Sequence, residues 1–99
     1  MARFSVFKNP EGLGYLLDVQ ANLLSHLNTR VVLPLLPQSH APKPADTLNP
    51  TFVIDGVPHV LVTQFMAAVP CAMLQSFTLS VEDRAHEVVA ALDCLFQGI

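Results

Sequence analysis

Apolar side chains recur at helical spacing from Ser80 to the end of the chain, and charged or polar side chains occupy the other faces. The apolar positions are Val81, Ala85, Val88, Val89, Leu92, Leu95 and Phe96. This pattern predicts an amphipathic helix over residues 81–96, about 24 Å long. Ser80 is suited to the N-cap position, and Asp83 completes a variant of the capping box. Gly98 should end the helix in the left-handed conformation.

Short runs rich in apolar and β-branched residues precede this helix and predict strands. They cover residues 3–7, 15–19, 29–36, 51–54, 57–63 and 69–74. The pair Asp55-Gly56 separates two of these runs and predicts a tight hairpin between them. Pro34 lacks an N–H, so it should lie at a sheet edge or at a bulge. Residues 64–68 are ambiguous, and residues 75–79 are expected to lead into the helix.

Three segments between the runs have the composition of loops. Residues 8–14 are dense in turn residues and should connect two antiparallel strands. Residues 21–28 contain three leucines and predict either a short helical turn or an irregular excursion. Residues 37–50 contain four prolines, and a weakly structured loop of this length is typical of a binding or mobile segment.

Polar residues interrupt the strand pattern at three positions. Asp18 and Gln20 flank Val19, and each is expected to be either a buried polar group bonded to a neighbouring strand or a surface group at a strand end. Arg30 lies among apolar neighbours, so it should pair with a carboxylate or a carbonyl group. A functional role for Arg30 is the alternative.

The elements predict a mainly β fold with one C-terminal helix, formed as a single domain over residues 1–99. One helix can cover only part of a sheet of five or six mostly antiparallel strands. A curled, barrel-like sheet is therefore expected, because it covers its own apolar face and leaves few open edges.

The composition of the chain predicts a second subunit. Hydrophobic residues make up 52% of the chain and charged residues 13%, and no Asp, Glu, Lys or Arg occurs from Gly56 to Val81. So much uncharged surface predicts burial by a second subunit, as in a homodimer. The net charge of −3 argues against direct nucleic-acid binding. No run is long enough for a membrane span and no signal peptide is apparent, so a cytoplasmic protein is expected.

No arrangement of residues predicts catalysis. The chain has no Gly-rich phosphate loop, no GxSxG and no HExxH, and its carboxylates are scattered. His86 next to Glu87 is a weak pair, because adjacent residues on a helix do not face each other. Cys71 and Cys94 form no CxxC motif and are expected to be reduced and buried. The histidines lack zinc-ligand spacing, so neither an enzyme activity nor a metal or other cofactor is expected.

Several motifs occur together, in an order that suggests a known family. They are Phe4-x-Val6-Phe7, Tyr15-x-x-Asp18-Val19-Gln20, the run from Leu27 to Leu35 (LNTRVVLPL), Asp55-Gly56, Ala68-Val69-Pro70 and the ending Leu95-Phe96-Gln97-Gly98-Ile99. In this order they resemble the CcdB family, the toxin half of a bacterial toxin–antitoxin module. The resemblance covers nearly the whole chain and is weakest in the proline-rich loop.

The resemblance implies a fold and a function. The family has an SH3-like curled antiparallel sheet, a small second sheet and a C-terminal helix, and it forms homodimers. Its members bind the A subunit of DNA gyrase and trap gyrase with cleaved DNA. A cognate antitoxin neutralises them through a disordered segment that orders on binding. Such a toxin acts by binding one state of its target better than the others.

The resemblance also assigns site residues. Gln97, Gly98 and Ile99 fall at the gyrase-poisoning positions, and Asp93 and Leu23 fall at other gyrase-facing positions. Gly98 would permit close approach of the backbone, and Ile99 would supply apolar area. Ile99 could alternatively fold back as the hydrophobic contact of a glycine C-cap.

The best-known family pattern has Trp where this chain has Gln97, so weaker gyrase binding, or reliance on Leu23 and Ile99, is expected. Antitoxin contacts are expected in a loop made of Lys8, Asn9, Pro10, Glu11, Gly12, Leu13 and Gly14, with the proline-rich loop as a second candidate.

Two other functions remain open from the sequence. MazF-like toxins share the general barrel and cleave RNA, but they need a basic groove, and outside the proline-rich loop and the helix only Arg3, Lys8 and Arg30 could supply one. The other alternative is a non-toxic homologue that still binds an antitoxin.

Overall fold

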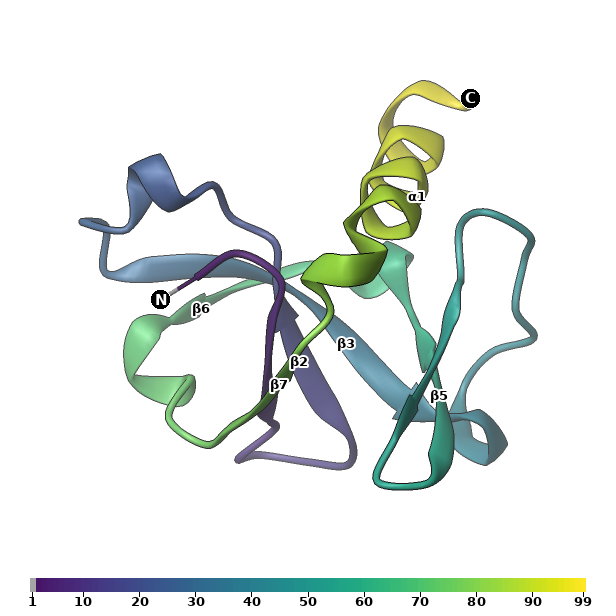
Figure 1. Ribbon diagram of the computed structural model, residues 1–99, viewed down its shortest axis with the longest axis horizontal. Coiled ribbons are helices and arrows are strands. Elements are labelled where there is room, and N and C mark those ends of the chain that lie inside the picture. The colour runs from purple at the N-terminus through teal and green to yellow at the C-terminus, as the bar shows by residue number, and fades with distance from the viewer. Residues whose placement is uncertain (1) are drawn as a thin grey trace.

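Seven short strands form a curled antiparallel half-barrel in the computed structural model, which describes residues 2–99 (Figure 1). They are β1 (Ser5–Lys8), β2 (Tyr15–Asp18), β3 (Thr29–Pro37), β4 (Thr51–Ile54), β5 (Val57–Leu61), β6 (Ala67–Pro70) and β7 (Phe77–Ser80). The sheet order is β4-β5-β3-β2-β1-β7, and β6 pairs with β3 outside this path. The predicted mainly β fold with a C-terminal helix is confirmed.

The nine-residue strand β3 is the centre of the sheet because it pairs with three other strands. One edge pairs with β2. The other edge pairs first with β6, through residues 29–32, and then with β5, through residues 35–37. Pro34 lies in the gap between these two partners, where its missing N–H breaks no ladder hydrogen bond. Because this edge of β3 pairs with two different strands, β6 and β5 can diverge from each other, and the sheet curls.

Two turns with left-handed residues set the strand pairings. Asp55 and Gly56 have φ values of 53° and 74°, as the predicted Asp-Gly hairpin between β4 and β5 requires. Gly14, at the end of the β1–β2 loop, has φ 84°. A Cβ atom at Gly14 would lie 2.1 Å from the carbonyl oxygen of Leu35, so only glycine allows the loop to close against β3.

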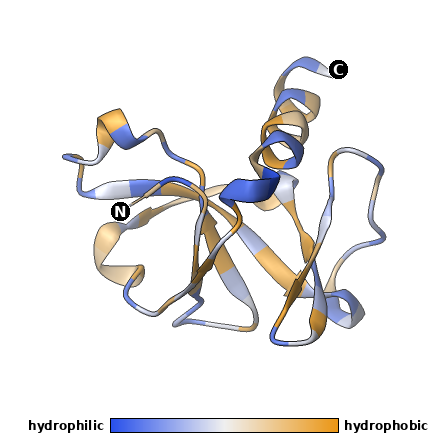
Figure 2. Cartoon of the chain, in the orientation of Figure 1, coloured by the Kyte–Doolittle hydropathy of each residue, from blue (hydrophilic) through white to orange (hydrophobic). Residues whose placement is uncertain are grey.

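The core lies inside the curl and is covered at one end by α1 (Ala85–Gln97). Its fully buried side chains include Leu17, Leu33, Leu35 and Leu61, and α1 contributes Val88. Figure 2 shows the corresponding alternation of apolar and polar positions along the strands, with a strongly hydrophilic turn just before the helix. No helix within residues 2–99 is long and apolar enough to cross a membrane.

The prediction of a buried strand over residues 69–74 is wrong. The strand is β6, it ends at Pro70, and most of it is exposed. Pro70 cannot donate to a ladder, and the chain turns directly afterwards in the 3₁₀ segment η4 (Cys71–Met73), where the N–H of Leu74 donates to the carbonyl of Cys71 at 3.0 Å. Leu74 is buried in a second, smaller cluster.

The segment expected only to lead into the helix contains the edge strand β7, which pairs with β1 across an irregularity between Val6 and Phe7. Ser80 ends this strand, and its Oγ accepts a hydrogen bond from the N–H of Glu82 at 3.2 Å. A 3₁₀ turn, η5 (Glu82–Arg84), follows, so α1 begins four residues later than predicted, at Ala85 rather than Val81. The predicted end is confirmed: Gly98 has φ 71°, and its N–H donates to the carbonyl of Cys94 at 3.1 Å.

The glycine at the β1–β2 loop generates a stability prediction. We expect Gly14→Ala to lower the free energy of unfolding by at least about 2 kcal/mol, because the new methyl group meets backbone and the positive φ disfavours alanine. Gly12→Ala, in the same loop, is the matched control: its Cβ would meet only a side-chain nitrogen at 3.5 Å, so a change within about 0.5 kcal/mol is expected. Urea denaturation of both variants measures the difference, and equal stabilities would contradict the close-packing account.

Candidate functional site

The end of α1 extends beyond the folded core. Phe96 and Ile99 are 67% and 77% exposed, and Gln97 and Gly98 between them are also exposed. Figure 1 shows this end of the chain pointing away from the sheet. Gly98 therefore forms the expected glycine C-cap, but Ile99 does not fold back onto the core. A Cβ atom at Gly98 would meet nothing within 4 Å, so a partner's surface can approach the backbone there.

Phe96 belongs to this exposed end, although the sequence pattern placed it on the buried face of the helix. The buried helix positions are Val88 and Ala91. Val89 and Phe96 share a stripe about a quarter turn away from Val88, and both are exposed. The offset from the middle of the apolar face is the signal in the sequence that could have identified Phe96 as a surface residue.

The other two predicted gyrase-facing residues differ in their surroundings. Asp93 is partly buried and lies one helical turn before Gln97, on the same side of α1. Leu23 is 86% exposed in the 3₁₀ turn η1 (Asn22–Leu24). Figure 1 shows η1 and the end of α1 projecting from the same side of the sheet, well separated from each other. In a single copy of the chain, Asp93 therefore lies near the exposed tail, residues 96–99, whereas Leu23 lies apart from it.

The predicted antitoxin loop, residues 8–14, lies at the opposite end of the molecule from the C-terminus (Figure 1). It is compact, because the N–H of Asn9 donates to the carbonyl of Gly14 at 3.1 Å and the N–H of Glu11 donates to Oδ1 of Asn9 at 3.0 Å. Leu13 is half-exposed. A cleft of about 380 Å³ lies against the start of the loop, lined in part by Lys8 and Met73.

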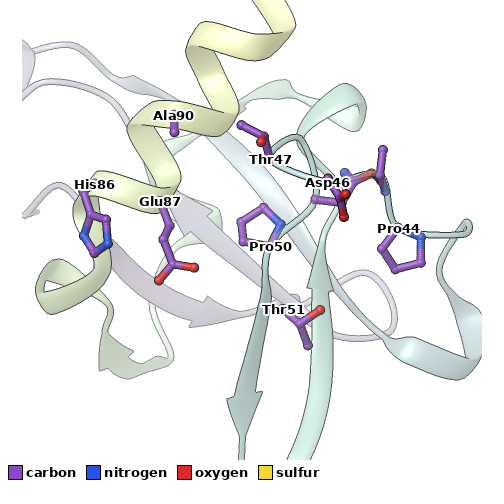
Figure 3. Close-up of a pocket in the computed structure, with 10 residues that line it drawn as sticks. Pro44, Asp46, Thr47, Pro50, Thr51, His86, Glu87 and Ala90 are labelled. Carbon is purple, nitrogen blue, oxygen red and sulfur yellow. Dashed lines mark hydrogen bonds between the residues drawn. The ribbon is translucent and has the colours of Figure 1, made fainter. Parts of the chain in front are cut away.

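A larger cleft, of about 430 Å³, separates the proline-rich segment from the first turns of α1. Figure 3 shows its two walls, with helix residues on one side and loop residues on the other. The helix wall contains His86, Glu87 and Ala90, and the loop wall contains Pro44, Asp46, Thr47, Pro50 and Thr51.

The loop that forms this cleft is more ordered than the weakly structured segment predicted from its prolines. Asn49 is buried and donates from Nδ2 to the carbonyl of Leu61 at 2.9 Å, which fastens the loop to β5. Thr63 donates from its hydroxyl to the carbonyl of Leu48 at 2.6 Å.

Glu87 does not behave as a free acid or base in this cleft. Both of its carboxylate oxygens accept hydrogen bonds from the Arg84 guanidinium, and the pKa of Glu87 is lowered chiefly by these bonds. Arg84 also stacks over the ring of Phe52, 3.9 Å from its centroid. This arrangement ties η5 to β4 and the first turn of α1, and it favours a structural role for the pair.

A buried ion pair lies at the ends of β2 and β3. Arg30 donates from Nε and Nη2 to the two carboxylate oxygens of Asp18, at 2.9 and 3.0 Å, and the two side chains are 1% and 0% exposed. The expected pairing of Arg30 is confirmed. Its burial leaves no guanidinium surface for a substrate, which removes one of the few cations that an RNA-cleaving groove could use. Within residues 2–99, Nη1 of Arg30 has no hydrogen-bond partner.

Other groups that could support chemistry are dispersed. Among residues 2–99, no group of three or more His, Cys, Asp and Glu side chains could hold a metal ion. Cys71 and Cys94 are free and only partly buried, not fully buried as expected.

Comparison with known families agrees with the resemblance of the motifs. The family model described as CcdB protein matches residues 3–98. The chain belongs to the CcdB family. Membership implies that the chain is the toxin half of a toxin–antitoxin module. No curated protein matched the chain in a sequence comparison.

In this CcdB-family chain, Gln97, Gly98 and Ile99 are the exposed residues that the family resemblance predicts to bind the target, and Phe96 precedes them. The tail combines an aromatic and an aliphatic side chain with an unobstructed glycine. Neither side chain is buried by the chain's own core, so both are available to a partner.

The Asp18–Arg30 and Arg84–Glu87 ion pairs of this CcdB-family chain should differ strongly in their effect on stability. We expect Asp18→Asn to lower the free energy of unfolding by about 3–5 kcal/mol, because it leaves the Arg30 charge buried without compensation. Glu87→Gln is the comparison and should cost about 0.5 kcal/mol or less, because solvent screens that partly exposed pair.

The Glu87 pair also has a pH signature. Its pKa is lowered in the folded state, so its stabilisation is present above the ordinary Glu pKa of about 4.3 and is lost as the pH falls through the lowered value. Urea denaturation at several pH values should therefore show wild type and Glu87→Gln converging in acid. A larger loss for Glu87→Gln than for Asp18→Asn at pH 7 would refute this ranking.

Proposed function

We propose that this CcdB-family protein is a gyrase poison that uses the end of α1 to bind the A subunit of DNA gyrase and hold gyrase in its complex with cleaved DNA. The observation that carries the proposal is the exposure of Phe96 and Ile99 on either side of Gln97 and Gly98. Leu23 and Asp93 are proposed as further contacts. The protein would act in the cytoplasm, without a cofactor and without bond-breaking chemistry of its own.

The physical basis of the proposal is selective binding. A protein that binds one state of an enzyme more tightly than the others shifts the enzyme's population toward that state by the difference in affinity. Aromatic and aliphatic anchors that become fully buried carry most of the energy in such contacts. In this chain Phe96 supplies an exposed aromatic ring next to the position where the best-known family pattern has Trp.

We further infer that the protein forms a homodimer. Exposed apolar side chains lie on the outer stripe of α1, at Val89, and on the turn that α1 packs against, at Phe65. A second copy covering part of this surface would reduce its contact with water and present two tails to gyrase. Sedimentation equilibrium should give twice the 10.8 kDa chain mass, and a monomer at micromolar concentration would refute the dimer.

The loop of residues 8–14 is proposed as an antitoxin contact. It lies at the end of the molecule opposite the tail, so one variant can separate the two functions. We expect Leu13→Ser to weaken binding of the cognate antitoxin by about tenfold or more, because a half-exposed leucine loses its apolar contact, and to leave gyrase binding unchanged. Isothermal titration with each partner measures both, and an unchanged antitoxin affinity would refute the assignment.

Removal of Gly98 and Ile99 tests whether the end of the chain binds gyrase. Because Ile99 packs against nothing in the core, the shortened protein should keep its stability within about 0.5 kcal/mol. Its affinity for the gyrase A subunit should fall by about ten- to a hundredfold, since burying an isoleucine side chain contributes about 1.5–3 kcal/mol. Cleaved-DNA accumulation by gyrase should fall in parallel.

Val53→Ala is the control for this experiment. Val53 is 69% exposed on β4, so the variant removes an equally accessible aliphatic side chain from another surface. Gyrase binding should be unaffected. If the shortened protein kept full affinity and full cleaved-DNA accumulation, the tail assignment would be wrong.

Gln97 distinguishes an active poison from a non-toxic homologue. We expect Gln97→Trp to tighten gyrase binding by about thirtyfold, because a tryptophan at a contact centre contributes about 2 kcal/mol. Growth inhibition of gyrase-sensitive cells should increase accordingly. An unchanged affinity would show that residue 97 lies outside the contact, and cleavage of bare RNA by the wild type without gyrase would favour the ribonuclease alternative.

A further inference from the structure

The segment of residues 21–28, which contains η1, contributes no side chain to the buried core. All eight of its residues are exposed, including Leu23 at 86%, and none of the residues in η1 is buried. Leu24 and Leu27 are 40% and 41% exposed, so apolar contacts fix the segment only in part and its conformation also depends on hydrogen bonds. The hydrogen bonds that reach it from the rest of the chain therefore contribute to how Leu23 is presented.

The side chain of Gln20 joins the middle of this segment to the start of β3, where the segment ends. Its Nε2 donates to the carbonyl of Thr29 at 3.1 Å, where the segment returns to β3, and to the carbonyl of Leu24 in η1, more weakly, at 3.4 Å. Its Oε1 accepts from the N–H of Val31 at 3.0 Å. One amide group thus connects the 3₁₀ turn to the first residues of the central strand.

The backbone of Gln20 is fixed by the buried ion pair. Its N–H donates to Oδ1 of Asp18 at 3.0 Å, and its carbonyl accepts from Nη2 of Arg30 at 3.0 Å. Every hydrogen-bonding group of Gln20 therefore has a partner within the fold. Hydrogen bonds thus connect the buried ion pair to Gln20 and Gln20 to η1, beside the bond that the N–H of Arg3 donates to Oδ1 of Asn22 at 2.7 Å.

We propose that Gln20 is a positioning residue that holds the exposed segment of residues 21–28 in the conformation in which Leu23 meets gyrase. The proposal rests on the gyrase-binding function proposed above. A segment already ordered before binding avoids the entropic cost of becoming ordered in the complex, so the amide of Gln20 increases affinity without touching gyrase. Gln20 acts through Leu23, and this dependence can be measured.

The first measurement is amide hydrogen exchange on the free protein. In Gln20→Ala, exchange at the N–H groups of Leu24, Ser25 and Leu27 should accelerate by about tenfold, because these groups donate within the segment that Gln20 fastens. Exchange in β5 should not change. Gln75→Ala is the matched control, since its amide also donates to a turn carbonyl, that of Ala72 at 2.8 Å, in an exposed turn elsewhere in the chain.

The second measurement is affinity for the gyrase A subunit in a double-mutant cycle. Gln20→Ala and Leu23→Ala should each weaken binding by about tenfold, and the double variant should be no weaker than either single variant. A purely structural defect would instead lower the melting temperature and add to the effect of Leu23→Ala. Antitoxin affinity, measured alongside, should remain within about twofold of wild type.

The outcomes separate the two proposals. Unchanged exchange in Gln20→Ala, or additive losses in the double variant, would overturn the positioning role even where wild type binds gyrase normally. Failure of wild type to bind the gyrase A subunit would defeat the proposed function and, with it, the gyrase-directed role of Gln20. Accelerated exchange together with a non-additive loss of gyrase binding supports the positioning role.

Discussion

The buried ion pair between Asp18 and Arg30 is the interaction on which the rest of the structure depends. It joins the ends of β2 and β3, and both charges are removed from water. Such a pair contributes little net stability when complete, because desolvation offsets much of the attraction, but either partner alone is costly. The pair therefore specifies one arrangement. Through Gln20 it also fixes the path of the chain between β2 and β3, which carries the exposed leucines.

The end of α1 contributes little to the stability of the fold. The curled sheet covers its own core, α1 adds only Val88 and Ala91 as fully buried side chains, and the last helical turn extends past the sheet. Phe96 and Ile99 lie outside the hydrophobic core, and most of each side chain is exposed. A folded support with an exposed apolar end is suited to recognition of a larger partner, which is consistent with membership of the CcdB toxin family.

Much of this architecture could be predicted from sequence patterns. The Asp55-Gly56 turn, the helix ending at Gly98 and the pairing of Arg30 follow from local chemistry and were predicted correctly. The strand β7 was missed because its residues alternate weakly, and only pairing with β1 reveals it. The prediction of a strand over residues 69–74 was wrong because it relied on the apolar residues and neglected Pro70, after which the chain turns.

The candidate site was only partly predictable. Gln97, Gly98 and Ile99 came from the family resemblance, whereas Phe96 was placed on the buried face although its offset from the middle of the apolar stripe indicated exposure. The ordered proline-rich loop depends on a single buried side chain, Asn49, whose partners are distant in sequence. The proposed role of Gln20 likewise depends on hydrogen bonds between residues on either side of the segment of residues 21–28.

The central claim is that the end of α1 touches gyrase directly. Photo-crosslinking tests it, with benzoylphenylalanine replacing Phe96 in one variant and Phe77 in another, since these two rings are similarly exposed, at 67% and 60%, on different surfaces. Irradiation with purified gyrase and DNA should attach the Phe96 variant to the A subunit and leave the Phe77 variant free. Attachment through position 77 with none through position 96 would contradict the account.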